Sequence, residues 1–322
     1  MSKEIYYVNP IAHAMKWYGE ISEDYVSNPE KYVRKFSVVI NGKLRHLVTY
    51  NPNRDGQRLR SLHMAVTDYI KRKYNQANSS YAYTVGKNIL NCVNEHIKAE
   101  AFLKTDIHRY FDSISYEKML SRVFELKPAN NFKKYLKSII KACFYDDKLP
   151  IGFVSSPVLS DLFLVDLDKK FEKKKNITYT RYADDFIISV NNLDSEPLLN
   201  QVKLELEADL SDLGLELNTK KTYIRRFKFK GDAIHVLGVN IVKDSPTNRI
   251  TISDRYIRET CRMISDYINS PQEMKEINLP KVSGRIEFVR YCSKSSFQKL
   301  YKMTRVKCGI DCDLTAKSLK KI

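Results

Sequence analysis

The sequence predicts an α+β fold, with hairpins and helices mixed in the middle of the chain and helices dominating its last third. Residues 36–50, "FSVVINGKLRHLVTY", have the pattern strand, Asn-Gly, strand, and Asn-Gly supplies the positive φ angles of a tight hairpin. Apolar residues at helical spacing follow in 59–76. From Ser253 onward the chain is basic and has a helical pattern. This order of elements argues against a doubly wound parallel sheet.

Helices and one short strand are expected in the first half. Residues 59–76 form an amphipathic helix by their apolar spacing, and residues 77–96 form a polar loop leading into a second helix. Residues 101–115, "AFLKTDIHRYFDSIS", begin as a short buried strand that ends near Asp106. Aromatic residues come next, and Ser115 is placed to cap the following helix.

The centre of the chain adds a glycine loop, a buried helix and further strands. Ser156 is the expected N-cap and Pro157 the first residue of a helix that is apolar nearly all round. A later helix has leucines on one face, and Gly214 is placed to end it. Residues 233–242 are expected to form a strand that contains a glycine, followed by the short strand "NRITIS".

Two adjacent acids lie at the centre of the most strand-like segment, residues 179–190, "YTRYADDFIISV". An unpaired charge inside a strand costs on the order of several kcal/mol, and adjacent like charges repel. Asp184 and Asp185 are therefore either turn residues in water or ligands of a cation. Asp106, at the end of another apolar strand, favours the cation, because three carboxylates from neighbouring strand ends can hold two Mg²⁺ ions about 4 Å apart.

Composition favours a polyanionic partner. Lys and Arg number 55 against 38 acidic residues, a formal net charge of +17, and the pI is near 9.4. Such an excess favours nucleic acid, although a basic protein without such a partner is the alternative. No run of 18 apolar residues occurs, and the first ten residues lack the apolar core of a signal peptide. We therefore expect a cytoplasmic protein without a membrane partner, and scattered free cysteines agree with this.

Five segments, in order, resemble the motifs of reverse transcriptases, in particular those of the bacterial retron and defence-associated group. They are "LKTDIHRYFDSI", "LPIGFVSSPVLSDLFLVDLD", "RYADD", "LGLELNTKKTYI" and "VLG". The resemblance covers about residues 36–300 and implies a right-hand polymerase fold. It places fingers in 1–98 with part of 115–157, the palm in 99–240, and a basic helical thumb in 241–322.

The resemblance implies a catalytic centre with two Mg²⁺ ions, for which Mn²⁺ is a substitute. Asp106, Asp184 and Asp185 would be the metal ligands, with help from the carbonyl of Ile107. Lys221 would lie near the β- and γ-phosphates of the incoming nucleotide as a proton donor to pyrophosphate. The neighbouring Lys220 is the competing choice for that role.

The resemblance also implies a set of nucleotide contacts. Phe111 would be the steric gate that selects dNTPs, the alternative being an aromatic side chain packed in the core. Lys43 is a weaker candidate than Arg45 for the triphosphate, since it could equally be a charge at the hairpin edge. The residues assigned to nucleotide binding are Arg45, Lys43, Phe111, Tyr110, Gly152, Ser156 and Tyr182.

Contacts to the primer and to a duplex are assigned further along the chain. Leu237 and Gly238 would form the grip under the primer. Arg255, Arg258 and Arg262 form a stripe on a helix whose other face is apolar, which suits a thumb that follows a nucleic-acid backbone. The alternative is a solvated helix face without a ligand.

The expected function is the synthesis of DNA on a bound, structured noncoding RNA from dNTPs, in antiviral defence in a bacterium. An accessory defence protein or a second copy of the chain are further candidate partners. Ile151 stands where the family usually has Gln, and this motivates the alternative of protein-primed, repetitive or template-independent synthesis. A non-catalytic RNA-binding scaffold and a two-metal nuclease are the remaining candidate functions.

Overall fold

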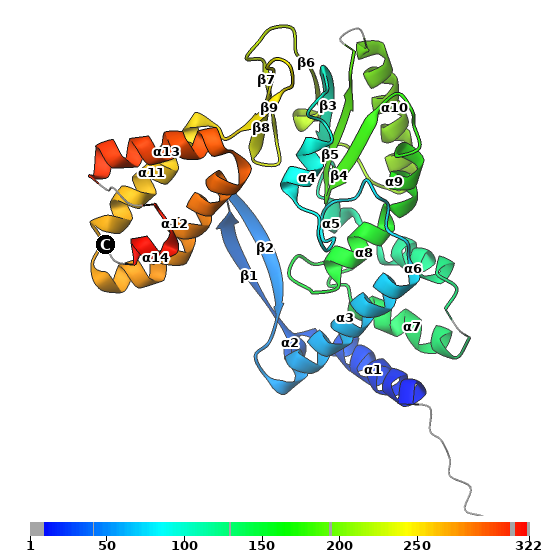
Figure 1. The fold of residues 1–322 in the computed structure, drawn as a ribbon. Helices are drawn as coiled ribbons and strands as arrows, with labels where there is room; N and C mark the ends of the chain where they lie inside the picture. Colours follow the sequence, from blue (N-terminus) through cyan, green and yellow to red (C-terminus); the bar gives the residue numbers. More distant parts are fainter. Residues whose placement is uncertain (1–9, 41, 129, 193–194, 310–312, 321–322) are drawn as a thin grey trace, which may run out of the picture. The chain divides into compact units, whose positions relative to one another are not determined.

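The computed structural model describes residues 10–40, 42–128, 130–192, 195–309 and 313–320 (Figure 1). It contains helices and antiparallel strand pairs, as the sequence predicts for an α+β protein. The chain forms two compact units. The first comprises residues 1–87, 105–186 and 200–222, and the second comprises 88–104, 187–199 and 223–322.

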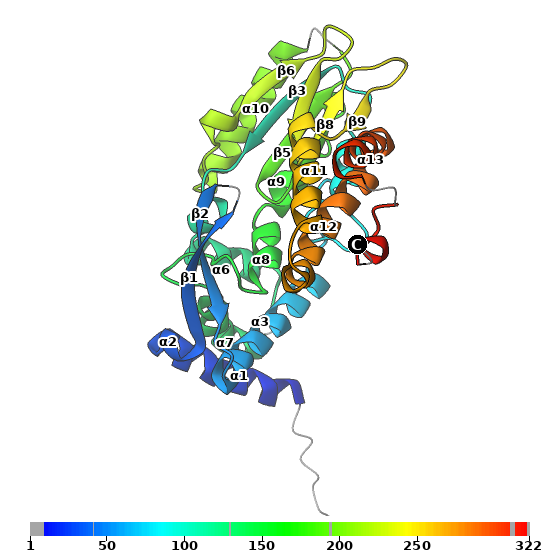
Figure 2. The same ribbon diagram turned by 90° about the vertical axis from the view of Figure 1, so that its left-hand side faces the viewer.

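Helices of the first unit surround a hydrophobic core near its N-terminal end. Helices α1 (Pro10–Ser27) and α2 (Pro29–Tyr32) precede α3 (Arg54–Lys73), and α7 (Asn130–Ala142) packs along α1. Both ribbon views show α1, α3 and α7 side by side (Figures 1 and 2). The predicted helix at 59–76 is confirmed, but it begins five residues earlier because the Asn53 side chain accepts a hydrogen bond from the backbone of the first turn.

The predicted hairpin is confirmed as β1 (Val33–Ile40) and β2 (Lys43–Tyr50), which pair antiparallel in full register. The connection is two residues long, and Gly42 in it has a φ of +74°. Asn41 lies outside the described residues. A tight turn of this kind needs positive φ angles, which glycine supplies without steric cost.

Four short helices of the first unit carry or support functional side chains. They are α5 (Tyr110–Ser113), α6 (Tyr116–Glu125), α8 (Ser156–Phe163) and α9 (Val165–Phe171). Ser115 caps α6 as predicted, through a hydrogen bond from the backbone of Lys118. The predicted N-cap role of Ser156 is wrong, because Ser155 precedes α8 and the Ser156 hydroxyl donates to the carbonyl of Pro150 at 2.7 Å.

A four-stranded sheet positions the acidic residues. Its order is β4 (Thr178–Tyr182), β5 (Asp185–Val190), β3 (Ala101–Asp106) and β6 (Tyr223–Arg226). Helix α10 (Glu196–Asp212) and the 3₁₀ turn η1 (Thr219–Lys221) lie between β5 and β6 in sequence. Gly214 follows α10 with a φ of +72°, as predicted for a glycine that ends a helix.

The second unit contains α4 (Ile89–Asn94) and a three-stranded antiparallel sheet, β7 (Ala233–Val236), β8 (Val239–Val242) and β9 (Arg249–Thr251). The expectation of one strand over 233–242 is wrong. Leu237 and Gly238 have φ angles of +48° and +88°, so they turn the chain back and form a hairpin.

Helices complete the second unit, in agreement with the prediction for the chain after Ser253. They are α11 (Asp254–Ile268), α12 (Gln272–Cys292), α13 (Lys294–Cys308) and α14 (Ala316–Leu319). Helix α11 packs against both α12 and α13 through a face on which Ile257, Cys261 and Ile264 are buried. Within the described ranges, every helix is too short or too polar to cross a bilayer.

Candidate active site

Asp106 ends strand β3 with its carboxylate inside the protein. The residue is only 3% exposed, and its backbone carbonyl accepts a hydrogen bond from the N–H of Asn218 at 2.8 Å. The next residue, Ile107, donates its N–H to the carbonyl of Asp184 at 3.0 Å. Backbone hydrogen bonds therefore join the end of β3 both to the turn after β4 and to the segment before η1.

The turn between β4 and β5 presents the adjacent acids. Ala183 and Asp184 form the turn and Asp185 begins β5, so one acid is a turn residue and the other a strand residue. Ala183 has a φ of +57°, a left-handed conformation that an alanine adopts only at a cost. Burial raises the pKa of Asp184, and the negative charge of Asp106 raises it further. The positive charges of Lys221 and Arg45 lower it.

A buried ion cluster holds this turn in place. The Arg181 guanidinium is fully buried and lies 2.7 Å from a carboxylate oxygen of Asp161 and 2.5 Å from one of Asp168. It also donates to the carbonyl of Ala183 at 2.9 Å. Because a buried guanidinium is costly without such partners, its two carboxylates fix the side chain, and the side chain fixes the turn residue that precedes Asp184.

Lys221 is paired with the acidic centre in this structure. Its ammonium forms a salt bridge with Oδ2 of Asp106. Burial alone would lower the pKa of Lys221, but this hydrogen bond and the charges of the three aspartates raise it above the usual value. The three carboxylates therefore all act on one ammonium group, which stays protonated.

These groups line one cavity of about 480 Å³, a size suited to a small-molecule ligand. The cavity combines three carboxylates with three cations and two aromatic rings. Its lining residues are Arg45, Leu47, Asp106, Ile107, Arg109, Tyr110, Phe111, Asp112, Ile151, Asp184, Asn218 and Lys221.

The predicted aromatic residues take different positions in the cavity wall. Phe111 is half-buried, and its ring meets that of Tyr110 edge-on at 5.5 Å between centroids. Tyr110 is 3% exposed, and its hydroxyl donates to the backbone carbonyl of Ser160 in α8. Tyr110 therefore supports the wall through its ring, while Phe111 is the more accessible of the two.

The glycine loop before α8 is tied to the hairpin. The N–H of Val48 in β2 donates to the carbonyl of Ile151 at 3.0 Å. Gly152 has a φ of +121°, and a Cβ there would lie 2.3 Å from the carbonyl oxygen of Val48. Only glycine allows this approach. Gly152 and Ser156 therefore shape the loop that carries Ile151 into the cavity.

The acidic residues suit a divalent cation that arrives with a phosphate ligand. Oδ1 of Asp106 is buried and has no hydrogen-bond partner within the described part of the chain. Across the same residues, no group of three or more His, Cys, Asp or Glu side chains is arranged to hold a metal ion by itself. Mg²⁺ typically binds one or two carboxylates together with substrate phosphates and water, so Asp106 and Asp184 fit this coordination.

Several predicted residues lie outside the cavity lining. Tyr182 and Asp185 are half-buried on either side of the turn, and the side chain of Lys43 lies outside the described residues. In the second unit, Leu237 and Gly238 form the β7–β8 turn. Helix α11 exposes all three predicted arginines, and the first pairs with Glu259 at 2.9 Å; they are Arg255, Arg258 and Arg262.

Sequence reasoning missed two groups of residues. Arg109, with a φ of +47°, and Asp112 and Asn218 line the cavity beside the predicted residues. The buried Arg181 cluster was missed because its members are far apart in sequence. One signal was present: Asp161 is the one charged residue of α8, and a charge in such a helix needs a buried partner.

Comparisons with known proteins identify relatives of this chain. Residues 33–241 match the family model described as reverse transcriptase (RNA-dependent DNA polymerase). The retron Ec73 reverse transcriptase of Escherichia coli is 28% identical over 240 residues, which cover 69% of this chain and 72% of that protein. The retron Ec83 reverse transcriptase of the same organism is 26% identical over 280 residues, covering 82% and 83%.

A solved structure shares the fold. The telomerase of Candida albicans, solved with a fragment of telomeric RNA, aligns with 89% of this chain and 60% of its own length, at a TM-score of 0.51 and 11% identity. The right-hand polymerase fold and the resemblance to retron-type enzymes are thus confirmed. The chain belongs to the family of reverse transcriptases, the RNA-dependent DNA polymerases.

Proposed function

We propose that this reverse transcriptase makes DNA on a bound, structured noncoding RNA by two-metal-ion phosphoryl transfer, as part of antiphage defence in the bacterial cytoplasm. One observation carries the chemical part of this proposal: a single cavity contains the carboxylates of Asp106 and Asp184, the Lys221 ammonium and Arg45. Its carboxylates suit metal ions, and its cations suit a triphosphate.

Each residue has a distinct task in this proposal. Two Mg²⁺ ions, or Mn²⁺ in their place, would activate the primer hydroxyl and stabilise the leaving oxygen; the ligands are Asp106, Asp184, Asp185 and the carbonyl of Ile107. Arg45 binds the triphosphate, and Phe111 packs under the sugar. Lys221, kept protonated by its acidic neighbours, gives its proton to the leaving pyrophosphate.

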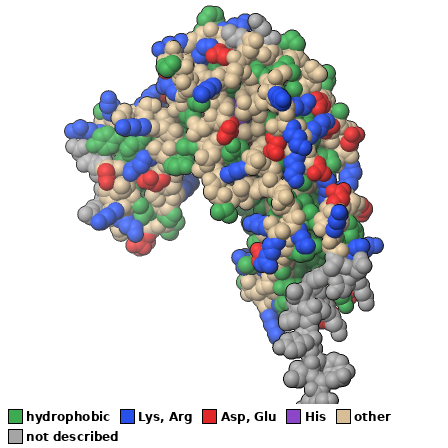
Figure 3. Space-filling view, turned by 45° about the vertical axis from the view of Figure 1, so that its right-hand side comes forward, with side chains coloured by type: hydrophobic (Ala, Val, Ile, Leu, Met, Phe, Trp, Pro, Cys, Tyr) green, Lys and Arg blue, Asp and Glu red, His purple; other side chains and the backbone are tan. Residues whose placement is uncertain are grey.

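We assign the remaining parts as the sequence predicted, with fingers in 1–98 and part of 115–157, palm in 99–240 and thumb in 241–322. The turn at Leu237 and Gly238 holds the primer, and the arginines exposed on α11 follow a nucleic-acid backbone. On the face shown in Figure 3, basic and acidic side chains are interspersed. The net charge of +17 supports a polyanionic partner.

The RNA partner and the role in defence are proposed from the relatives, which are retron enzymes of bacteria. An accessory defence protein or a second copy of the chain would complete the system. The test is to purify the protein from its native operon, sequence the bound nucleic acid, and add dNTPs with Mg²⁺. Templated synthesis requires DNA complementary to part of that RNA, and DNA unrelated to it contradicts the proposal.

Asp106→Asn is the sharpest single change for the chemistry, because it preserves shape and removes the buried charge. We expect DNA synthesis to fall on the order of a hundredfold or more, as several kcal/mol of metal-assisted stabilisation are lost. Asp166→Asn is the matched control, since Asp166 pairs with Arg122 at the surface. Equal DNA synthesis by the two variants would remove Asp106 from the catalytic centre, and equal defence despite lost synthesis would argue for a non-catalytic scaffold. Phage plaque counts with the same pair test whether synthesis is needed for defence.

Ile151 favours a second candidate function, protein-primed, repetitive or template-independent synthesis. This side chain lines the cavity and offers no hydrogen bond, where the family usually has a glutamine. Product sequencing separates the candidates. A homopolymer or short repeat made without RNA supports the second candidate, and a copy of an RNA segment rejects it.

A further inference from the structure

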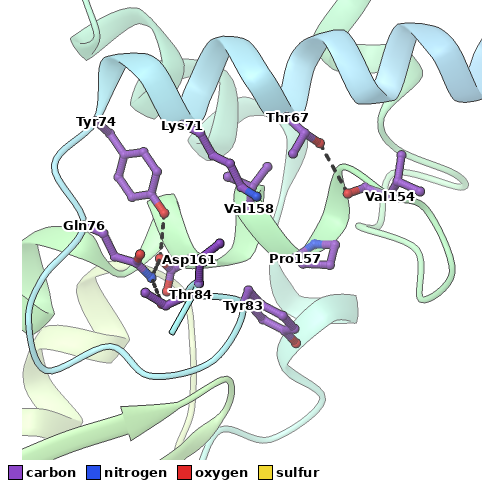
Figure 4. Close-up of a pocket in the computed structure, with 11 residues that line it drawn as sticks. Thr67, Lys71, Tyr74, Gln76, Tyr83, Thr84, Val154, Pro157, Val158 and Asp161 are labelled. Atoms are coloured by element: carbon purple, nitrogen blue, oxygen red, sulfur yellow. Dashed lines mark hydrogen bonds between the residues drawn. The ribbon is translucent and has the colours of Figure 1, made fainter. Parts of the chain in front are cut away.

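A second, smaller pocket lies in the first unit between α3, the segment 74–85 and the start of α8. Its volume is about 200 Å³, below the range of drug-sized ligand sites. Figure 4 shows Lys71 descending from α3 and Tyr83 lying below it, near Pro157 and Val158 of α8. The pocket thus offers an aromatic ring, apolar atoms and one cation in a space suited to a single planar group.

The segment that carries Tyr83 is fixed by the buried ion cluster. Ser80 donates its hydroxyl to Asp161 at 2.6 Å, and Gln76 donates to the same carboxylate at 2.7 Å. Gln76 also donates to the Thr84 hydroxyl at 2.6 Å. Tyr74 donates a further hydrogen bond to Asp161, which Figure 4 shows beside those of Gln76. These hydrogen bonds therefore hold the wall of the pocket in place before a ligand binds.

This segment runs beside the catalytic turn. Arg181 donates its N–H to the carbonyl of Ser79, and Tyr81 donates to the carbonyl of Arg181, both at 2.9 Å. Ser80 and Arg181 form a parallel bridge. Arg181 lies three residues before Asp184 in the chain, and Ser80 lies three residues before Tyr83. Burial and then the charge of Asp184 raise the pKa of Tyr83 to about 12.

Tyr83 has a backbone conformation that bulky residues rarely adopt. Its φ is +61°, which costs free energy for a bulky side chain, and the residue remains 44% exposed. Within the described ranges its hydroxyl makes no hydrogen bond, and Lys71 has no ion pair or hydrogen bond either. A strained, exposed ring and a free cation beside a catalytic site indicate a ligand surface.

We propose that this pocket binds one unpaired nucleobase of the template strand, the one next to the nucleotide being copied, with Tyr83 against the base and Lys71 at its phosphate. The proposal rests on the templated synthesis proposed above, because only a template has a nucleotide at that position. Aromatic rings stack on any base, so the site is tolerant of sequence. A lysine ammonium beside the ring suits the adjoining phosphate.

Three template–primer duplexes test the proposal through single-nucleotide addition. One RNA template ends at the copied nucleotide, one extends beyond it by a single nucleotide, and one extends by a single abasic nucleotide. For the native protein we expect the one-nucleotide extension to raise kcat/KM roughly tenfold, within the range for one base–aromatic stack, and the abasic one to give little gain. A native ratio near one overturns the proposal.

Variants are compared by that ratio, so a general loss of activity does not affect the result. Tyr83→Leu should bring the ratio close to one, and Tyr83→Phe should keep it, because the ring remains. Tyr223→Leu is the control, since this tyrosine is exposed to a similar extent, 41%, in the second unit. A ratio that is unchanged in Tyr83→Leu overturns the proposal.

A crosslinking experiment tests whether the template base binds in this pocket and does not depend on DNA synthesis. A template with 4-thiouridine at the first extended position is irradiated in the complex, and the attached peptide is identified. We expect attachment within 74–85, lost in Tyr83→Leu and retained in Tyr223→Leu. Attachment elsewhere overturns the proposal that this pocket binds the template base. If the native protein extends none of the duplexes, the proposed synthesis has failed instead, and the crosslink still reports on the pocket.

Discussion

Replacing Arg181 by methionine should destabilise the first unit severely. The guanidinium is fully buried, and the two carboxylates that it pairs, those of Asp161 and Asp168, are almost completely buried as well. The methionine side chain would leave both without a cation. Removing one partner of a buried ion pair typically costs about 3–5 kcal/mol, and a whole domain is stable by only about 5–15 kcal/mol. We therefore expect Arg181→Met to lose about 4 kcal/mol or more of unfolding free energy.

Asp161→Asn should be much milder. The carboxylate accepts four hydrogen bonds, from Tyr74, Gln76, Ser80 and Arg181. An amide has only one acceptor oxygen, so the NH₂ group of the asparagine would face two of these donors. Rotation of the tyrosine hydroxyl and a flip of the glutamine amide would restore both hydrogen bonds. Arg181 keeps Asp168 as its counter-charge. A loss of about 1–2 kcal/mol is expected, close to that of one unsatisfied buried group.

The assay is guanidinium unfolding followed by the fluorescence of Trp17, the only tryptophan of the chain, which lies in the same unit. Lys35→Met is the control, because Lys35 pairs with Asp146 at the surface of the same unit, and such pairs contribute at most about 1 kcal/mol. If Arg181→Met unfolds within about 1 kcal/mol of this control, the buried cluster does not hold the turn and our account of it is refuted.

Three further predictions concern the gate, the glycine loop and acid stability. Phe111→Val should raise kcat/KM for rNTPs about tenfold or more relative to dNTPs, measured by single-nucleotide addition; unchanged rejection removes Phe111 from the gate. Gly152→Ala should lose about 1–3 kcal/mol in chemical unfolding, since its φ is +121° and a carbonyl of β2 blocks a Cβ, whereas Gly284→Ala, within α12 and with open space around it, should gain about 0.5–1 kcal/mol. Burial lowers the pKa of His63 and of His96 from 6.5 to about 3. Because these folded-state values lie below the unfolded ones, the stability is full above pH 6.5 and declines below it by about 1.4 kcal/mol per pH unit for each histidine. Unfolding at pH 7.5 and 5.5 checks this, and His63→Gln should reduce the difference; an equal difference in this variant would contradict the assignment.

Local signals accounted for most of the fold. The hairpin at 33–50 and the helix cap at Ser115 depend on residues within a few positions of each other, so propensity and spacing suffice to predict them. The end of β3 at Asp106 was predictable for the same reason. Segment 233–242 was misread because its turn is Leu-Gly rather than Asn-Gly, and leucine rarely adopts a positive φ.

Long-range contacts account for what the sequence could not predict. The glycine loop is held by the N–H of Val48 in β2, which donates to the carbonyl of Ile151, about a hundred residues along the chain. Arg181 precedes the acidic turn in sequence, yet its partners come from two helices. Pairings of this kind depend on how distant elements pack, and periodicity carries no information about them.

The acidic centre needs a compensating positive charge when no ligand is bound, and it needs free carboxylates when a ligand binds. Lys221 can meet both needs. Without a ligand, the charges of Asp106 and Asp184 repel, and Asp106 is buried where a bare charge is costly. The ammonium of Lys221 offsets this and is held protonated by the same charges. With a metal ion held by these carboxylates, Lys221 would be free to bind the phosphates, still carrying its proton. Lys221→Met should therefore slow synthesis and also destabilise the ligand-free protein at neutral pH, whereas Lys220→Met should do neither. Slower synthesis with unchanged stability would show that the salt bridge to Asp106 contributes nothing to the resting state.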